Sequence, residues 1–113
     1  MKLPNGEIAV VDIAKLLDYC LSVAHPEGRH EARVFRAVLG IGPAESHMLQ
    51  ERLRAAVCDQ EAVAGEFDGF GQRYVMDFSL EHSGRRALVR SAWIVLVNED
   101  FPRLTSCYIL RGI

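Results

Sequence analysis

Apolar residues recur at a helical period in the first half of the chain and alternate with polar residues in the second half. The first helix is expected to begin after Asp12, because aspartate is a favourable N-cap residue. A stripe of apolar residues at helical spacing would face the core, and it consists of Ile13, Leu16, Leu17, Cys20 and Leu21. Cys20 belongs to this stripe, so we interpret it as a core residue and not as a nucleophile. The residues His-Pro-Glu-Gly at 25–28 end the helix.

Two further helices are expected before residue 60. The second begins near Arg29 and ends at Gly40, since glycine is common directly after a helix C-terminus. Its buried face comprises Ala32, Phe35, Val38 and Leu39. Pro43 fits the first turn of the third helix, which continues to about Cys58. The apolar positions of that helix are Leu49, Leu53, Ala56 and Val57.

The period changes to two after residue 72, which indicates β-strands. One side of the first clear strand carries Tyr74, Met76, Phe78 and Leu80, and the other side carries Arg73, Val75, Asp77 and Ser79. A hairpin turn at 82–85 (His-Ser-Gly-Arg) leads into 88–97, which is apolar almost throughout and is therefore expected to lie centrally in the sheet. Pro102 fits only the start of the last strand, which runs from about Arg103 to Leu110.

A further strand, near Glu61–Glu66 or near Ile8–Val11, would complete the sheet. Helices followed by hairpin-linked strands are typical of the α+β class. We therefore predict about three N-terminal helices followed by a three- to five-stranded antiparallel sheet, in a single domain covering residues 1–113.

Composition restricts the class of protein. The chain has 113 residues, of which half are hydrophobic, and this suits one domain with one core. Three cysteines without a CxxC pair argue against a disulfide framework and a zinc ribbon. No apolar run approaches the roughly eighteen residues of a membrane helix, and the first fifteen residues do not resemble a signal peptide. A soluble, cytoplasmic domain with no membrane partner is expected.

The net charge of −2 conceals an uneven distribution. Residues 1–28 sum to −2, residues 29–54 to +2, residues 55–84 to −5 and residues 85–113 to +3. Eleven of the thirteen basic residues are arginine, which suits bidentate contacts with phosphate better than lysine does. Two interpretations stay open, a solvated surface and a small basic site on an otherwise neutral domain.

Histidines are the first candidates for chemistry. None of the four, at positions 25, 30, 47 and 82, has the HExxH spacing of a helical metal site. The sequence also lacks nucleotide-loop, kinase and GxSxG motifs, so we predict neither a metal nor a cofactor. His25 and His30 flank the start of the second helix, where backbone N–H groups favour an anion.

The last two strands carry the other candidates. By strict alternation, Arg103 and Thr105 share one face of the sheet, while Ser106 and Tyr108 share the other, so these four could not line one cleft. Arg90 faces away from its neighbours Ser91 and Trp93, and Trp93 is expected in the core.

Arg90 itself is unusual, because an arginine in a central strand is costly to bury unpaired. It needs either a carboxylate or a ligand anion. A salt bridge to Asp77 on the neighbouring strand is one explanation, and a bound anion is the other.

Two segments, HPEGRHEARVFRAVLGIG and VRSAWIVLVNEDFPRLTSCYIL, resemble an uncharacterised bacterial domain family. Its members occur alone and at the C-terminal ends of polymorphic toxins. The family pattern runs KL-DYLL, HP-G--KA--F---LG, G--Y, V-(T/S)AWI and PRL-T-Y. The matching residues are Lys15-Leu16, Asp18-Tyr19-Cys20-Leu21, His25-Pro26, Gly28, Ala32, Phe35, Leu39-Gly40, Gly71, Tyr74, Ser91-Ala92-Trp93-Ile94, Pro102-Arg103-Leu104 and Tyr108.

The toxin context and the order of elements resemble the compact ribonuclease fold of many bacterial toxins. This resemblance implies metal-independent cleavage of RNA, with a small cognate antitoxin or immunity protein as a second partner. His25 or His30 would be the general base, because histidine titrates near neutral pH. Arg90 or Arg103 would neutralise the scissile phosphate, and Thr105 or Tyr108 would position it or protonate the leaving oxygen.

One departure from the family pattern favours a second hypothesis. Glu31 stands where the pattern has lysine, and a glutamate there would repel a phosphate. Ser106 and Cys107 also stand between Thr105 and Tyr108, so the alignment of the pattern's threonine stays open by one position. The alternative is a non-catalytic interaction module that binds a small partner protein, which the acidic segment 55–84 also favours.

Overall fold

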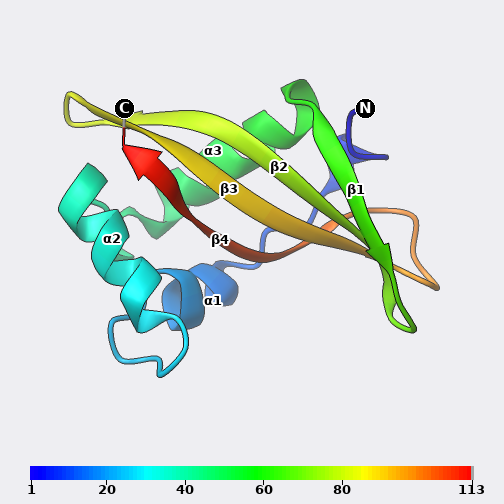
Figure 1. Ribbon diagram of the computed structural model, residues 1–113, viewed down its shortest axis with the longest axis horizontal. Helices are drawn as coiled ribbons and strands as arrows, with labels where there is room; N and C mark the ends of the chain where they lie inside the picture. Colours follow the sequence, from blue (N-terminus) through cyan, green and yellow to red (C-terminus); the bar gives the residue numbers. More distant parts are fainter. Residues whose placement is uncertain (113) are drawn as a thin grey trace.

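The computed structural model of the chain describes residues 1–112 and confirms the α+β prediction (Figure 1). The helical elements are α1 (Ile13–Lys15) with a π-helical turn at Leu16–Cys20, α2 (Arg29–Leu39) and α3 (Ser46–Asp59), with short 3-10 turns at Gly6–Ile8 and Pro43–Glu45. The strands are β1 (Ala62–Phe67), β2 (Gly71–His82), β3 (Arg85–Leu96) and β4 (Arg103–Gly112). They form one antiparallel sheet in the order β1-β2-β3-β4. No helix within residues 1–112 has the length and apolar character needed to cross a membrane.

The helices pack on one face of the sheet. In Figure 1, α3 passes behind β2 and β3, while α1 and α2 lie on the side of the sheet where β4 is the edge strand. Contacts join α2 to β3 and β4, α3 to β2, and α1 to β4. The strand residues of the core therefore come from one side of the sheet, and they include Met76, Phe78, Leu80, Val89, Trp93, Cys107 and Ile109. We call the opposite side the open face.

The first helix begins as predicted and then departs from α-helical geometry. Asp12 Oδ1 accepts a hydrogen bond from the Ala14 N–H at 2.9 Å, which confirms Asp12 as the N-cap. The Leu21 N–H then donates to the Leu16 carbonyl at 2.8 Å, the i to i+5 bond of a π turn. Leu16 and Leu21 are buried, but Leu17 is 38% exposed. Its predicted place in the stripe was wrong, because the wider π turn changes the spacing of the buried positions.

Helices α2 and α3 follow the sequence pattern closely. Phe35 is fully buried, and Val38 is only half-buried at the edge of the same face. Gly40 has φ of 68°, and its neighbour Ile41 donates to the Phe35 carbonyl at 3.2 Å, which is a glycine-dependent helix end. In α3 the four predicted apolar positions are buried.

The strands also form where alternation predicts them. Ser83 and Gly84 both have positive φ, 52° and 76°, as a two-residue type I′ hairpin requires. β3 lies between β2 and β4, which confirms its central position. Of the two candidates for an extra strand, 61–66 corresponds to β1, whereas Val10 makes only an isolated parallel bridge with Arg103.

A β-bulge in β4 changes which side chains reach the open face. Ser106 pairs with Ala92, but the next pair along is Leu104 with Trp93. Thr105 is therefore an extra residue without a partner on β3. Side chains on the two sides of Thr105 no longer follow one continuous alternation.

Replacement of Phe35 by alanine should lower the free energy of unfolding by about 3–5 kcal/mol, because a fully buried ring leaves a cavity. Phe70→Ala is the matched control, since this ring is 71% exposed, and the free energy should change by less than about 0.5 kcal/mol. Chemical denaturation of both variants measures the difference. Equal stability of the two variants would show that the buried face of α2 is assigned wrongly.

Candidate functional site

Trp93 and Ser91 fix the orientation of β3. Trp93 is only 1% exposed, and its indole N–H donates to Ser91 Oγ at 2.8 Å. Ser91 Oγ in turn donates to the Met76 carbonyl on β2 at 2.7 Å. This confirms that Trp93 belongs to the core. Because side chains alternate along a strand, Arg90 faces the other way, onto the open face.

Arg90 is held by Asp77 on β2, which confirms the predicted salt bridge. Nε donates to Oδ1 at 2.8 Å and Nη2 to Oδ2 at 2.9 Å, and each side chain is about one-third exposed (35% and 31%). The hydrogen bond to Arg90 lowers the pKa of Asp77. The same bond raises the pKa of Arg90, to which Tyr108 adds a smaller contribution.

Arg103 has the same geometry on β4. Its Nε and Nη2 donate to the two carboxylate oxygens of Glu99 at 2.7 and 2.8 Å, and the guanidinium lies 5.1 Å from the centre of the Phe101 ring. The hydrogen bond to Arg103 lowers the pKa of Glu99. The pKa of Arg103 is raised by that bond and, to a smaller extent, by the charge of Asp12.

The bulge at Thr105 corrects the prediction that Arg103 and Tyr108 face opposite sides. Tyr108 pairs with Arg90, Ser106 with Ala92, and Arg103 with Ile94, and all three β3 partners point to the open face. Alternation alone misplaced Ser106 and Tyr108 relative to Arg103, because it could not detect the extra residue. The open face therefore collects Arg90, Arg103, Ser106 and Tyr108.

Thr105 lines a hollow of about 240 Å³ at the β4 edge together with Arg103. The other residues around this hollow are Val10, Asp12, Lys15, Ile94 and Leu104. A second hollow of about 390 Å³ contains His25 and Tyr19 and shares Asp12 and Lys15 with the first. The two hollows thus adjoin at the start of α1, so the predicted grouping of Arg103 with Thr105 is retained.

His25 lies at the far end of this pair of hollows with its ring fixed. Its Nδ1 accepts hydrogen bonds from the N–H groups of Glu27 at 3.0 Å and Gly28 at 3.1 Å. Its ring also stands edge-on to Tyr19, with 4.8 Å between the ring centres. In the neutral ring the proton must then reside on Nε2, so His25 presents a hydrogen-bond donor to solvent.

His30 lies apart from the other candidates. It is exposed on the first turn of α2, whose residues pack from the helix side of the sheet. Of the six candidate residues, the structure therefore brings Arg90, Arg103 and Tyr108 onto one face and Thr105 into the adjoining hollow. His25 is linked to them only through Asp12 and Lys15.

Two residues at the site were missed by the sequence reasoning. Glu99 holds Arg103 from the loop before β4, and its spacing of four residues ahead of the arginine is the only signal that could have identified it. Lys15 lies where the two hollows meet. The sequence feature that could have identified it is its polar position in the first helical turn after Asp12, where the side chain is exposed.

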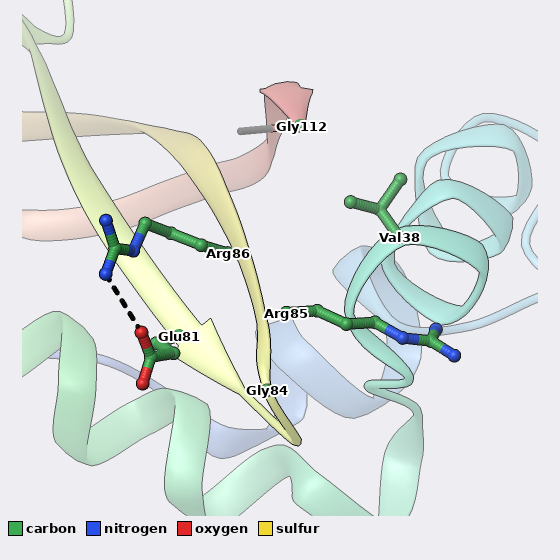
Figure 2. Close-up of a pocket in the computed structure, with 6 residues that line it drawn as sticks. All are labelled: Val38, Glu81, Gly84, Arg85, Arg86 and Gly112. Atoms are coloured by element: carbon green, nitrogen blue, oxygen red, sulfur yellow. Dashed lines mark hydrogen bonds and ion pairs between the residues drawn. The ribbon is translucent and has the colours of Figure 1, made fainter.

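A larger hollow, of about 490 Å³, lies at the β2–β3 hairpin and contains none of the six candidates (Figure 2). In Figure 2, Arg86 turns toward Glu81 while Arg85 extends toward α2. Arg86 pairs with Glu81 at 3.1 Å, and Arg85 donates to the Ala37 carbonyl at 3.3 Å. The size of this hollow does not by itself make it the functional site.

Metal ligands are also not grouped in the part of the chain that the structure describes. Within residues 1–112, no three His, Cys, Asp or Glu side chains lie together as ligands for an ion. Cys20 and Cys107 are buried in the core, which confirms the interpretation of Cys20 as a core residue.

The lowered pKa of Asp77 predicts how stability depends on pH. A carboxyl group with a depressed pKa stabilises the fold above its unfolded pKa of about 3.9, and this contribution disappears as the pH falls through the folded value. Asp77→Asn should therefore lower the Tm at neutral pH, and the difference from the unmodified protein should shrink below about pH 4. Thermal melts across this range test it. Asp59→Asn, at an exposed site on α3, is the control. A Tm difference between Asp77→Asn and the unmodified protein that did not vary with pH would contradict the ionic pairing of Asp77 with Arg90.

Comparison with known proteins agrees with the resemblance at the level of the family. No curated protein and no solved structure matches the chain. One family, described as "Domain of unknown function (DUF6883)", matches residues 2–111 and so covers nearly the whole fold, including β4 and both hollows. The chain belongs to this family, DUF6883.

Proposed function

We propose that the open face of the sheet binds RNA and cleaves it without a metal ion. The observation that carries this proposal is the presence of Arg90, Arg103 and Tyr108 on the face of the sheet opposite the core, where α1 borders the β4 edge through Lys15. Each carboxylate uses only Nε and Nη2 of its arginine. A guanidinium has five N–H groups, so the edge formed by Nη1 and Nη2 stays available for a phosphate.

The reaction would be an internal transfer followed by release of the leaving strand. The ribose 2′-oxygen attacks the adjacent phosphorus while its proton passes to a base. The bond from phosphorus to the 5′-oxygen breaks, and an acid protonates that oxygen. The products are a 2′,3′-cyclic phosphate and a free 5′-hydroxyl group. Charge on the equatorial oxygens of the phosphorane is neutralised by Arg90 or Arg103.

Proton transfer on this face falls to residues other than the expected histidine base. His25 presents Nε2–H, which can donate a hydrogen bond but cannot accept a proton, and neither His25 nor His30 stands on the open face. The Asp77 carboxylate is the acceptor beside Arg90, and it is ionised at neutral pH, although the hydrogen bond to Arg90 that lowers its pKa also weakens it as a base. Tyr108, next to Arg90, is the donor for the leaving oxygen, and Thr105 positions the chain at the β4 edge.

A toxin role follows from the same proposal. A domain that cleaves cellular RNA would arrest growth, and its host would need a small antitoxin or immunity protein to survive. Expression under a tight promoter tests this, with Arg103→Ala expected to relieve the arrest.

One observation favours the alternative, a module that binds a partner protein without catalysis. Four arginines on or beside the sheet, at 73, 86, 90 and 103, are each neutralised by a carboxylate. Three apolar side chains at the β1 edge are about 70% exposed: Val63, Phe67 and Phe70 (71%, 70% and 71%). Exposure of such side chains to water is unfavourable, and a group of them is typical of a surface that a partner protein covers. Growth arrest that Arg103→Ala does not relieve would support this alternative.

Substitution of Arg103 separates catalysis from structure. Arg103→Lys keeps the charge but loses the planar fork, so kcat/KM for RNA cleavage should fall markedly, and Arg103→Ala should reduce it on the order of a hundredfold because a charged contact to a phosphate of the bound strand is lost. Both variants should melt close to the unmodified protein, because the Arg103 side chain is 41% exposed, although that of Glu99 is only 19% exposed, and ion pairs near the surface contribute about 0–1 kcal/mol. Arg33→Ala, an exposed position on α2, is the control and should change neither quantity.

If Arg103 were only a structural partner of Glu99, both variants would lose Tm, and cleavage would fall only in step with the folded fraction. Fully active Arg103→Ala protein would remove Arg103 from the site.

Cleavage should be unaffected by chelation. Since no group of three ligands lies together within residues 1–112, EDTA should leave the rate of RNA cleavage unchanged. The measurement is the initial rate before and after dialysis against EDTA. Loss of activity that Zn²⁺ or Mg²⁺ restores would refute the metal-free mechanism.

A further inference from the structure

Arg90 and Arg103 present the same free edge from two places on the open face. In both, a carboxylate occupies Nε and Nη2 through two short hydrogen bonds. In both, the hydrogen bonds to the carboxylate leave Nη1 unused, and on Arg90 the Tyr108 hydroxyl lies near enough to contribute to the raised pKa of the guanidinium. Each guanidinium is therefore oriented before any ligand arrives, which reduces the entropy lost on binding.

The two guanidinium groups are too far apart to share one phosphate. Arg103 pairs with Ile94, which lies four residues from Arg90 on β3, so the two backbone positions are separated by about 13 Å along the sheet. The carboxylates also pull them apart. Asp77 holds Arg90 against β2, and Glu99 draws Arg103 toward the loop that precedes β4.

The surface between them is free of charge. The intervening cross-strand row consists of Val75, Ala92 and Ser106, which are small or neutral and only partly buried. An aromatic ring accompanies each arginine, Tyr108 beside Arg90 and Phe101 beneath Arg103. Unpaired bases stack on such rings, whereas bases within a duplex cannot reach them.

We propose that Arg90 and Arg103 bind two different phosphates of one single-stranded RNA segment that lies along β3 and β4. This inference rests on the proposed function, and it deepens it by naming the substrate as a single strand with more than one phosphodiester bond. Tyr108 supplies the ring on which a base near one phosphate stacks, and the plane of the Arg103 guanidinium, which lies over Phe101, supplies the second stacking surface.

Binding of 2′-O-methyl oligouridines tests the footprint, because the methyl group blocks the attacking oxygen and leaves the phosphates intact. The probes are an octanucleotide and a dinucleotide with one phosphodiester, each measured by fluorescence anisotropy over a range of salt concentrations. The octanucleotide should bind at least tenfold more tightly. The slope of log affinity against log salt should fall by about 0.7 in Arg90→Gln and again in Arg103→Gln, and by about 1.4 in the double variant.

Lysine variants keep the test independent of any loss of folding. Arg90→Lys and Arg103→Lys retain the charge, so the salt slope should persist while the affinity falls. Arg33→Gln on α2 is the matched control and should leave the slope unchanged. Two results would overturn the two-phosphate footprint. One is a salt slope that neither glutamine variant changes. The other is an affinity for the octanucleotide that still exceeds the affinity for the dinucleotide by the same factor in both variants.

Cleavage of unmodified RNA is measured in parallel, so that the two ideas fail separately. The predicted slopes without any cleavage would reject the ribonuclease proposal and support the footprint. Cleavage of a dinucleoside monophosphate as fast as that of the octanucleotide would reject the footprint and leave the ribonuclease proposal standing.

Discussion

The indole N–H of Trp93 has one acceptor in the core, Ser91 Oγ, and that hydroxyl completes the link by donating to the Met76 carbonyl on β2. An unsatisfied polar group at this depth would cost about 1–3 kcal/mol, so the arrangement strongly favours one register between β2 and β3. A slip by one residue would turn Arg90 into the core and Trp93 outward. The position of each side chain on the open face depends on this pair of hydrogen bonds.

The pairing of arginines with carboxylates has two opposing effects on anion binding. It removes net charge from the open face, and a phosphate arriving there meets the repulsion of Asp77 and Glu99 as well as the attraction of the guanidinium groups. It also holds each guanidinium in one orientation, so that little side-chain entropy remains to be lost. A site of this kind gains selectivity at the expense of affinity. It would bind a ligand with phosphates that match both guanidinium groups, and it would discriminate against small anions that match only one.

Much of the fold could be predicted because local signals agreed with the tertiary structure. Asp12 capped its helix and Gly40 ended the next, since both effects act within a few residues. Alternation along β2 and β3 placed Met76 inside and Arg90 outside. Prediction failed where backbone geometry departs from its regular repeat, at the π turn that exposes Leu17 and at the bulge that brings Arg103 and Tyr108 together. Neither irregularity could be predicted from periodicity, because each adds one residue to an otherwise regular repeat.

The candidate site was harder to predict for a related reason. Arg90 and Asp77 could be linked because they lie on consecutive strands of one hairpin. Asp12 and Lys15 line the Arg103 hollow although they lie about ninety positions from Arg103 in the sequence, and their place there depends on how α1 packs against β4.

The bulge at Thr105 also has a consequence for how this domain tolerates changes in length. Because Thr105 has no partner on β3, its codon could be deleted without turning any other side chain of β4 over. Deletion of Cys107, a paired residue, would shift the rest of β4 by one position and turn core-facing side chains toward the surface. Deletions should therefore be tolerated at Thr105 and at Leu110, the second residue of β4 without a partner on β3, and selected against at the paired positions between them.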